Sequence, residues 1–236
     1  MIVGAAAGRL AGIATARRNR MRVGILGSGL MGSKLGTIWA RAGHDVVFSY
    51  SRSRKTLERL ARDAQGSARA GTPREAVEGA DAVLLAVHWS QLDNVLAQAG
   101  DLAGEVVLTC SLPMNADNSE FVIAHTSSGA EELARKAAGA RVVAAFNTVP
   151  SEAFFNVFAA REGEPRPSLL FCGDDAGAKE IATALIRDVG YEPVDVGALR
   201  MSRFLEPFAM VVARIAYEGE GGPEVVYRFE RCGRSS

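Results

Sequence analysis

The stretch Arg22-Val23-Gly24-Ile25-Leu26-Gly27-Ser28-Gly29-Leu30-Met31-Gly32 decides the fold. It joins a short apolar run to the pattern Gly-x-Gly-x-x-Gly, and a helical pattern follows as far as Ala42. In a chain with 25 glycines the pattern alone is weak evidence. A strand before it and a helix after it, however, are the setting in which this pattern binds a dinucleotide.

Each glycine of the pattern has a separate expected task. Gly27 permits the tight turn, Gly29 lacks the Cβ that would block a pyrophosphate, and Gly32 lets the helix pack closely on the strand. Backbone N–H groups at the start of the helix then face the pyrophosphate. We therefore expect the whole turn to bind the cofactor, through Gly27, Ser28, Gly29, Leu30, Met31 and Gly32.

Beyond this turn, short apolar runs alternate with amphipathic stretches. The predicted strands are Arg22–Leu26, Asp45–Tyr50, Ser67–Ala70, Ala82–Val87, Val106–Cys110, Arg141–Phe146, Ser168–Cys172 and Pro193–Val196. The predicted helices are Met31–Ala42, Arg54–Ala64, Pro73–Glu78, Gln91–Ala99, Glu131–Ala138, Ala176–Val189 and Leu199–Glu218. Several strand runs lack period-2 alternation, which is typical of strands buried on both faces. The sequence therefore predicts an α/β fold: a Rossmann-type, doubly wound, mostly parallel sheet with a short C-terminal α/β extension.

The first twenty residues differ from the rest of the chain. They are rich in Ala and Gly and carry four arginines but no acidic residue. A targeting segment is one interpretation, and an upstream start codon ahead of Met21 is the other. We expect residues 1–20 to be a disordered or spurious extension, and residues 21–236 to be one nucleotide-binding domain whose C-terminal lobe begins near residue 165. The tail Pro223–Ser236 contains a Val225–Phe229 run that would suit an edge strand.

Composition narrows the function classes. The formal net charge is zero and charges are spread along the chain, so nucleic acid is not an expected partner. No apolar run approaches the ~20 residues of a membrane span. The three cysteines match no metal-ligand spacing, and isolated thiols favour a reducing compartment, so we expect a cytoplasmic protein without a metal.

The residues after the second strand distinguish between the two nicotinamide cofactors. A protein that binds NAD places Asp or Glu there to accept hydrogen bonds from the ribose 2′-OH. Here the strand runs into Ser51, Arg52, Ser53 and Lys55, and Asp45 is at the wrong end of the strand. Hydroxyls and cations bind a 2′-phosphate, which a carboxylate would repel. The sequence therefore predicts NADP(H).

An ordered set of later segments resembles the family of F420-dependent NADP oxidoreductases, over nearly the whole chain after Met21. The segments are His88-Trp89, Val142–Pro150, Cys172–Asp175 with Ala178-Lys179, and Asp195–Leu199 running into Ser202–Glu206. The same domain is related to the reductase domain of STEAP-type metalloreductases, which also carry a Phe-Asn-Thr segment. The resemblance implies hydride exchange between NADPH and a small redox carrier, either the deazaflavin F420 or a flavin such as FMN or FAD.

The resemblance also implies where the ligands bind. Val87, His88, Trp89 and Asn147 would lie along the nicotinamide side of the cofactor. Asn147, Thr148, Val149 and Pro150 would wall the second ring, and Ser202, Arg203 and Glu206 would line its pocket. Archetypal members have His at the position of Asn147, so the identity of the carrier is open at this point.

The residues themselves agree with hydride transfer, which needs ring stacking and distance rather than a nucleophile or general base. We accordingly assign no catalytic residue. Two alternatives remain: an NADPH-dependent reductase of a small carbonyl or imine, and a non-catalytic NADP(H) sensor. The first usually has a long helical C-terminal domain, whereas only about forty residues follow the last predicted strand. The apolar stretch Phe204–Ala216 fits either a core helix or a subunit contact, so a homodimer is the assembly we consider.

Overall fold

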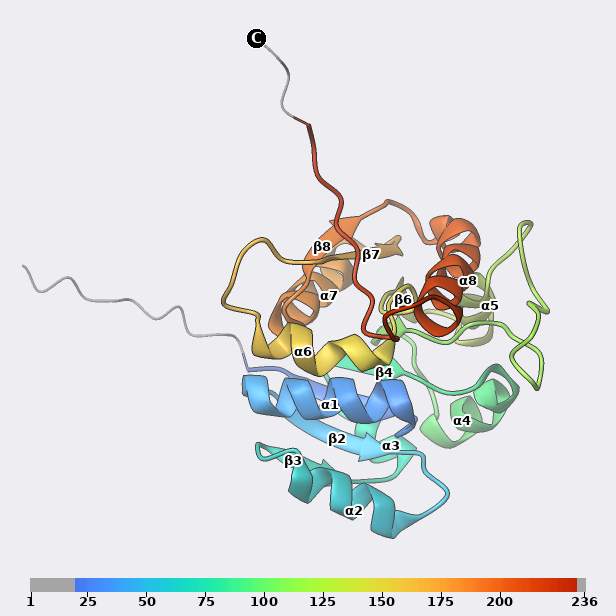
Figure 1. Ribbon diagram of the computed structural model, residues 1–236. Coiled ribbons are helices and arrows are strands. Elements are labelled where there is room, and N and C mark those ends of the chain that lie inside the picture. The colour runs from blue at the N-terminus through green and yellow to red at the C-terminus, as the bar shows by residue number, and fades with distance from the viewer. Residues whose placement is uncertain (1–19, 233–236) are drawn as a thin grey trace, which may run out of the picture.

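The computed structural model describes residues 20–232 (Figure 1). The predicted extension therefore falls outside the described residues except for Arg20, whose Nε donates to Asp45 Oδ2 at 2.7 Å. Asp45 lies at the amino end of its strand and also accepts from Ser67. It is thus engaged away from the edge where a ribose would bind.

The strands lie close to where the sequence predicts them. They are β1 (Arg22–Leu26), β2 (Asp45–Ser49), β3 (Ala68–Ala70), β4 (Ala82–Leu85), β5 (Val106–Thr109), β6 (Arg141–Ala144), β7 (Ser168–Gly173) and β8 (Glu192–Asp195). Strands β2, β4, β5 and β6 end one or two residues earlier than predicted, because their last apolar residues already belong to loops at the carboxyl edge. Strand β8 both begins and ends one residue earlier than predicted.

The helices agree with the sequence almost as well. They are α1 (Leu30–Ala42), α2 (Arg54–Asp63), α3 (Pro73–Val77), α4 (Leu92–Ala99), α5 (Gly129–Lys136), α6 (Phe154–Ala159), α7 (Ala176–Val189) and α8 (Ser202–Glu218). Short 3-10 turns precede three of them: η1 (Trp89–Gln91), η2 (Ser151–Ala153) and η3 (Leu199–Met201). Helix α6 was not predicted, because Phe154–Ala159 is a six-residue segment without a visible helical period.

All eight strands form one sheet in the order β3-β2-β1-β4-β5-β6-β7-β8. Every neighbouring pair is parallel except β6 and β7. The order reverses on either side of β1 and β4, which is the doubly wound pattern with its ligand crevice at the carboxyl ends of these strands. The predicted fold class is therefore confirmed. The sheet continues without a break through β7 and β8, where the C-terminal lobe was expected.

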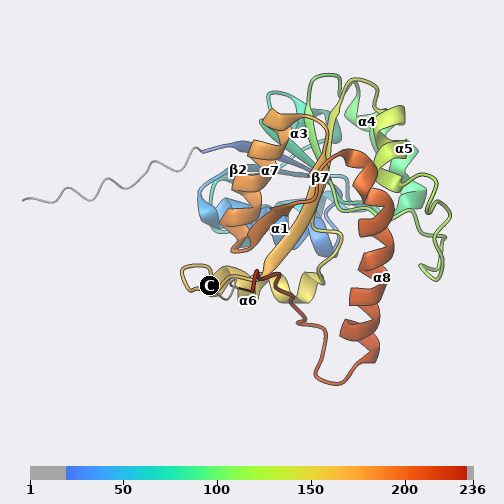
Figure 2. The same ribbon diagram turned by 90° about the horizontal axis from the view of Figure 1, so that it is seen from above.

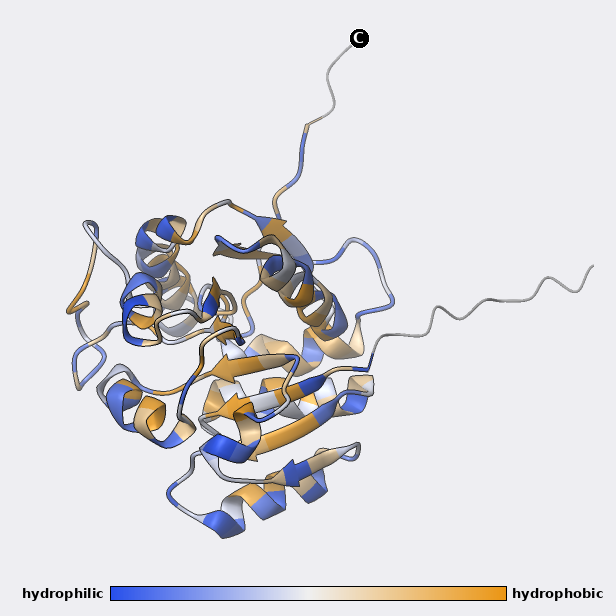
Figure 3. Ribbon diagram, turned by 180° about the vertical axis from the view of Figure 1, so that it is seen from behind, coloured by the Kyte–Doolittle hydropathy of each residue, from blue (hydrophilic) through white to orange (hydrophobic). Residues whose placement is uncertain are grey.

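Each face of the sheet has its own apolar core. Helices α1, α2, α6 and α7 contribute to one core, and α3, α4, α5 and α8 to the other. Figure 2 shows α3, α4 and α5 on one side of the sheet and α1 and α6 on the other. Along β2, Val46 and Phe48 face the first core and Val47 the second. Burial on both faces explains the apolar strands without alternation, which are orange in Figure 3.

The predicted edge strand at Val225–Phe229 is absent from the assigned strands. The tail nevertheless lies beside β7, because Ser168 N–H donates to the carbonyl of Tyr227 at 2.8 Å and Phe229 N–H donates to Ser168 Oγ at 3.0 Å. Two such bonds hold the tail without a continuous ladder.

Candidate cofactor site

The turn between β1 and α1 has the geometry that its glycines predict. Gly27 has φ +111°, and a Cβ there would lie 2.3 Å from the carbonyl oxygen of Ala86. A Cβ at Gly32 would lie 1.9 Å from the carbonyl oxygen of Gly27. A Cβ at Gly29 would meet no atom within 4 Å. The packing of the protein therefore requires glycine at positions 27 and 32, whereas the space beside Gly29 is open.

Among residues 20–232, the first backbone N–H groups of α1 donate to no acceptor, and they lie beside this space. Gly29 is the N-cap residue and has no side chain to cap the helix, and the first turn contains no acidic residue. The first backbone N–H groups of a helix have no partner inside it. Together with the positive end of the helix dipole they form a site for an anion such as a pyrophosphate.

A cleft of about 1110 Å³ extends from this turn along the carboxyl edge of the sheet. Of the predicted cofactor residues, Gly27, Ser28, Gly29, Ser51, Arg52, Val87 and His88 line it. Leu30, Met31, Gly32, Ser53, Lys55, Trp89 and Asn147 do not. The first three of these follow the turn into α1, where their backbone matters more than their side chains. The assignment of individual residues to the cofactor stays a prediction.

One end of the cleft is basic. Arg52 and Arg54 line it at the start of α2, next to Ser51. Arg54 is paired with Glu58 at 3.1 Å, whereas Arg52 forms no ion pair within residues 20–232. The chain reaches these residues through Tyr50, which has φ +56°. An unpaired guanidinium at the end of β2 is well suited to a phosphate on the ribose.

The polar side chains around Tyr50 could not be predicted from the sequence. Its hydroxyl lies 2.7 Å from Asn94 Oδ1 and 3.1 Å from Gln91 Oε1, and all three residues line the cleft. Asn94 and Gln91 are exposed positions of α4 and η1, which from sequence are indistinguishable from an ordinary solvated helix face. Only the fold brings them opposite the end of β2.

The other end of the cleft is formed after β4 and β5. The hydroxyl of Ser111 donates to the carbonyl of Val87 at 2.8 Å, and Val87 N–H donates back to Ser111 Oγ at 3.3 Å. His88 Nε2 lies 3.0 Å from Asn118 Oδ1, and Nδ1 accepts from Ser90 N–H at 3.3 Å. The imidazole thus connects η1 to the loop between β5 and α5, in an arrangement that needs the proton on Nε2.

Asn147 is buried after β6 and directly follows a residue with a strained backbone. The preceding residue, Phe146, has φ +67°, a conformation that a bulky side chain rarely adopts. Edge-to-face contacts hold its ring, with centroids 5.8 Å from Trp39 and 6.0 Å from Phe154. Asn147 Oδ1 is buried and has no hydrogen-bond partner within residues 20–232. Strain and an unsatisfied polar atom together are typical of a functional position.

The remaining predicted substrate residues after β6 are also buried. The Thr148 hydroxyl lies 2.7 Å from that of Tyr227, which connects the segment to the C-terminal tail. Val149 packs in the core beside α6, and Pro150 is the N-cap residue of η2. None of these three lines the described cleft, so their contact with a second ring stays a prediction.

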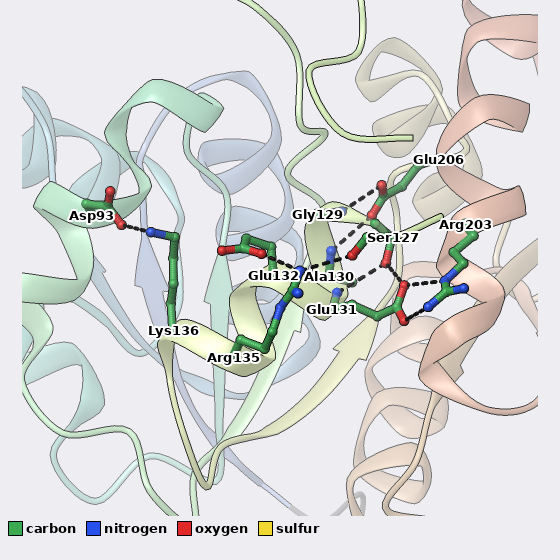
Figure 4. A network of polar contacts seen from close by, with 11 residues as sticks. Asp93, Ser127, Gly129, Ala130, Glu131, Glu132, Arg135, Lys136, Arg203 and Glu206 are labelled. Carbon is green, nitrogen blue, oxygen red and sulfur yellow. Dashed lines mark hydrogen bonds and ion pairs between the residues drawn. The ribbon is translucent and has the colours of Figure 1, made fainter. Parts of the chain in front are cut away.

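Ser202, Arg203 and Glu206 do not line the cleft. Arg203 and Glu206 instead connect α8 to α5 (Figure 4). Arg203 forms two hydrogen bonds to the carboxylate of Glu131, at 2.8 and 2.7 Å. Glu206 is 2% exposed and accepts from the N–H groups of Gly129 and Ala130 at 2.9 and 3.0 Å. Ser202 Oγ lies 3.2 Å from the buried Cys172 Sγ. These contacts give each of the three side chains a structural role. The geometry does not support a role for them in substrate binding.

Burial raises the pKa of Glu206 to about 7, against the effect of the two N–H donors. The neighbouring Glu131 adds to this increase. The carboxyl group that joins α8 to the start of α5 therefore changes its protonation near neutral pH.

A second polar network, which the sequence did not indicate, joins α1, η2 and α8. Lys34 Nζ donates to Ser151 Oγ at 3.0 Å, and Ser151 donates to Glu152 Oε2 at 3.2 Å. The hydroxyl of Tyr217 donates to the same carboxylate oxygen at 2.9 Å. Burial and Glu152 raise the pKa of Tyr217 to about 12. The network fixes the segment after Asn147 against the first turns of α1.

Residues 20–232 contain no group of three or more His, Cys, Asp or Glu side chains arranged to hold a metal ion. No helix in the same range is long and apolar enough to cross a membrane.

The doubly wound sheet, the glycine turn and the cleft at the carboxyl edge define a Rossmann-type dinucleotide-binding protein. Comparison with known proteins then shows which family the chain resembles. Residues 22–113 match the family model described as NADP oxidoreductase, coenzyme F420-dependent. The resemblance seen in the sequence is thereby confirmed, and it is to a family of NADP-dependent oxidoreductases.

A curated relative is the metalloreductase STEAP3 of Rattus norvegicus, which is 29% identical over 185 residues. The match covers 78% of this chain but 36% of the relative, so the chain spans about a third of the length of that protein. Its complete activity therefore does not carry over.

Two solved structures show the same fold. A candidate F420-dependent NADP reductase from Arthrobacter sp. FB24 has a TM-score of 0.78 and 22% identity, over 89% of this chain and 100% of the other. A reductive aminase from Aspergillus terreus, in complex with NADPH and ethyl-5-oxohexanoate, has a TM-score of 0.59 and 19% identity. That match covers 82% of this chain and 61% of the aminase.

Gly29→Ala and Gly32→Ala separate ligand binding from folding. We expect G29A to keep the wild-type melting temperature and to lose at least about tenfold in NADPH affinity, because the new methyl group enters only the open space beside the turn. G32A should instead unfold at a clearly lower temperature, since its Cβ meets backbone. Calorimetry and titration with NADPH measure both effects. Unchanged NADPH affinity in G29A would contradict this account of the turn.

Glu206→Gln tests the buried carboxylate through pH. The folded-state pKa is raised, so the folded protein binds the proton more tightly than the unfolded chain does. Stability should fall as pH rises from the unfolded value of ~4.5 towards 7, by at most about 3 kcal/mol relative to E206Q. Urea unfolding of both proteins at about pH 5 and pH 8 measures the difference. Parallel pH profiles would show that Glu206 does not titrate in this window.

Proposed function

We propose that this protein is an NADP(H)-dependent oxidoreductase that transfers hydride between NADPH and a deazaflavin or flavin-type carrier. The observation that carries the proposal is the open space beside Gly29, which faces the free N–H groups of α1 and continues into a cleft ending at Arg52. The family match and the NADPH-bound relatives of the same fold support NADP(H) as the cofactor.

The charges of the cleft favour a phosphorylated ribose. Arg52 and Arg54 lie at the end of β2, and the residues that line the cleft include no carboxylate. A ribose 2′-OH without a phosphate would have no acidic acceptor there, whereas a 2′-phosphate would meet guanidinium and serine donors.

The buried Asn147 is the side chain that we assign to the nicotinamide end. Its Oδ1 can accept one hydrogen bond that residues 20–232 do not supply. Bound NADPH would provide the hydride, and the chain would hold the two rings in contact and exclude water. No general base is required for this step. Whether the second ring is F420, FMN or FAD rests on the resemblance alone.

Reduction of a small imine or carbonyl is the second candidate function. The fold shared with the reductive aminase favours it, and the Lys34–Ser151–Glu152–Tyr217 network contains groups that can donate a proton. A non-catalytic NADP(H) sensor is the third. The free thiols Cys110, Cys172 and Cys232 suit a reducing compartment, and we propose the cytoplasm as the location.

Arg52→Ala should lower the affinity for NADPH by about 2 kcal/mol, the contribution of a charge-assisted hydrogen bond, and leave NADH nearly unchanged. The matched control is Arg59→Ala, which removes an exposed arginine of α2 that does not line the cleft. Isothermal titration with each cofactor gives the two affinities. An unchanged NADPH/NADH ratio in R52A would rule out this role.

The carrier can be identified by mixing the protein with NADPH and, in turn, F420, FMN, FAD, a ferric chelate and a cyclic imine. The absorbance of NADPH measures its oxidation. We expect rapid oxidation with one of the ring carriers. G29A is the matched control for nucleotide-dependent turnover. Turnover with the imine alone would favour the second function, and tight binding of NADPH without any turnover would favour the sensor.

A further inference from the structure

Helix α8 carries two parallel apolar rows, one buried and the other largely exposed. Leu205, Ala209, Val212 and Ala216 form the buried row. The adjacent row consists of Phe204, Phe208, Val211 and Ile215 at spacings of four, three and four residues. Phe204 is 65% exposed, and Val211 and Ile215 are each 54% exposed. Phe208 is half-buried, and its ring meets that of Tyr227 edge-on with centroids 5.6 Å apart. Figure 2 shows α8 along the outside of the molecule.

The spacing of the exposed row is that of a helix–helix seam. Residues four and three apart alternate along one side of a helix, as the a and d positions of a coiled coil do. From Phe204 to Ile215 the row extends about 16 Å, at 1.5 Å per residue. A soluble protein rarely leaves such a row uncovered unless another surface packs on it.

We propose that the exposed row of α8 packs against the same row of a second copy of this chain, with the two helices antiparallel. The midpoint of the row falls between Ala209 and Met210. A two-fold axis there would bring Phe204 of one copy opposite Ile215 of the other, and Phe208 opposite Val211.

The charges at the two ends of the helix favour this arrangement. Arg200 is exposed just before the amino end, and Glu218 and Glu220 are exposed at the carboxyl end. Within residues 20–232, neither Arg200 nor Glu220 forms an ion pair. In the antiparallel pair, Arg200 of each copy lies opposite Gly219–Glu220 of the other. A parallel pair would place like charges together at both ends.

A membrane surface fits the same row less well. Helices that lie on membranes carry an excess of Lys and Arg on their polar side. On the exposed part of α8, Arg214 is balanced by Glu218, to which it is paired. A single helix pair covers less area than the ~800 Å² per partner of a standard interface, so we expect a dissociation constant in the micromolar range.

Sedimentation velocity from about 1 to about 100 µM tests the proposal. The wild-type chain should shift from monomer to dimer over this range, and Val211→Glu should remain monomeric. The matched control is Val122→Glu, which places the same charge at a 56% exposed valine in the loop between β5 and α5 and should leave dimerisation unchanged. NADPH affinity is measured alongside, because V211E lies outside the cleft and should bind the cofactor normally.

A charge reversal tests the antiparallel arrangement itself. Arg200→Glu and Glu220→Arg should each weaken the dimer about tenfold at low salt, and the double variant should restore it. A wild-type chain that stays monomeric at the highest concentration would overturn the proposal. Co-sedimentation of such a monomer with anionic vesicles would indicate that the row binds a membrane surface instead. Failure of the double variant to recover would overturn the antiparallel pairing.

Discussion

The contact between the β1–α1 turn and the first turn of α1 is the constraint on which the rest of the site depends. Gly32 lies so close to Gly27 that no side chain fits between them. This approach directs the start of α1 to the end of β1, at the centre of the sheet. The open space beside Gly29 lies between Gly27 and Gly32, and close backbone contacts hold both of these glycines in place. The same two glycines therefore determine the packing of the first βαβ unit and the position of its anion site.

The fold could be predicted because its information is local. The strands at Val23–Leu26 and Val106–Thr109 are short apolar runs buried on both faces, and the glycines mark the turn between a strand and a helix. The strand ends were less accurate for a specific reason. Tyr50 and Phe146 continue an apolar run in sequence, but both adopt positive φ and leave their strands there. An apolar pattern carries no signal for such a conformation.

The polar residues that we predicted for the site fall into two groups. The position of some follows from the local order of strand and turn, whereas the position of others depends on contacts between distant parts of the chain. The position of Arg52 at the cleft could be predicted from sequence because the residue directly follows a strand of the sheet. The contacts of Arg203 and Glu206 could not be predicted from sequence, for the opposite reason. Their partners, Glu131 and the N–H groups at the start of α5, lie more than seventy residues away in the chain. A charged side chain on a helix has the same appearance in sequence whether it binds a ligand or another helix.

The burial of Asn147 has an energetic cost that its surroundings must offset. A buried acceptor without a partner costs about 1–3 kcal/mol, and the positive φ at the preceding residue adds a cost of similar size. The aromatic contacts of Phe146 with Trp39 and Phe154 hold the segment in place despite both terms. A fold optimised for stability alone would relax the backbone or supply a donor from a neighbouring helix. The proposed assignment of Asn147 to the nicotinamide end rests on this unsatisfied oxygen. An amide stays neutral at every pH, so in that role it would act through hydrogen bonding rather than proton transfer.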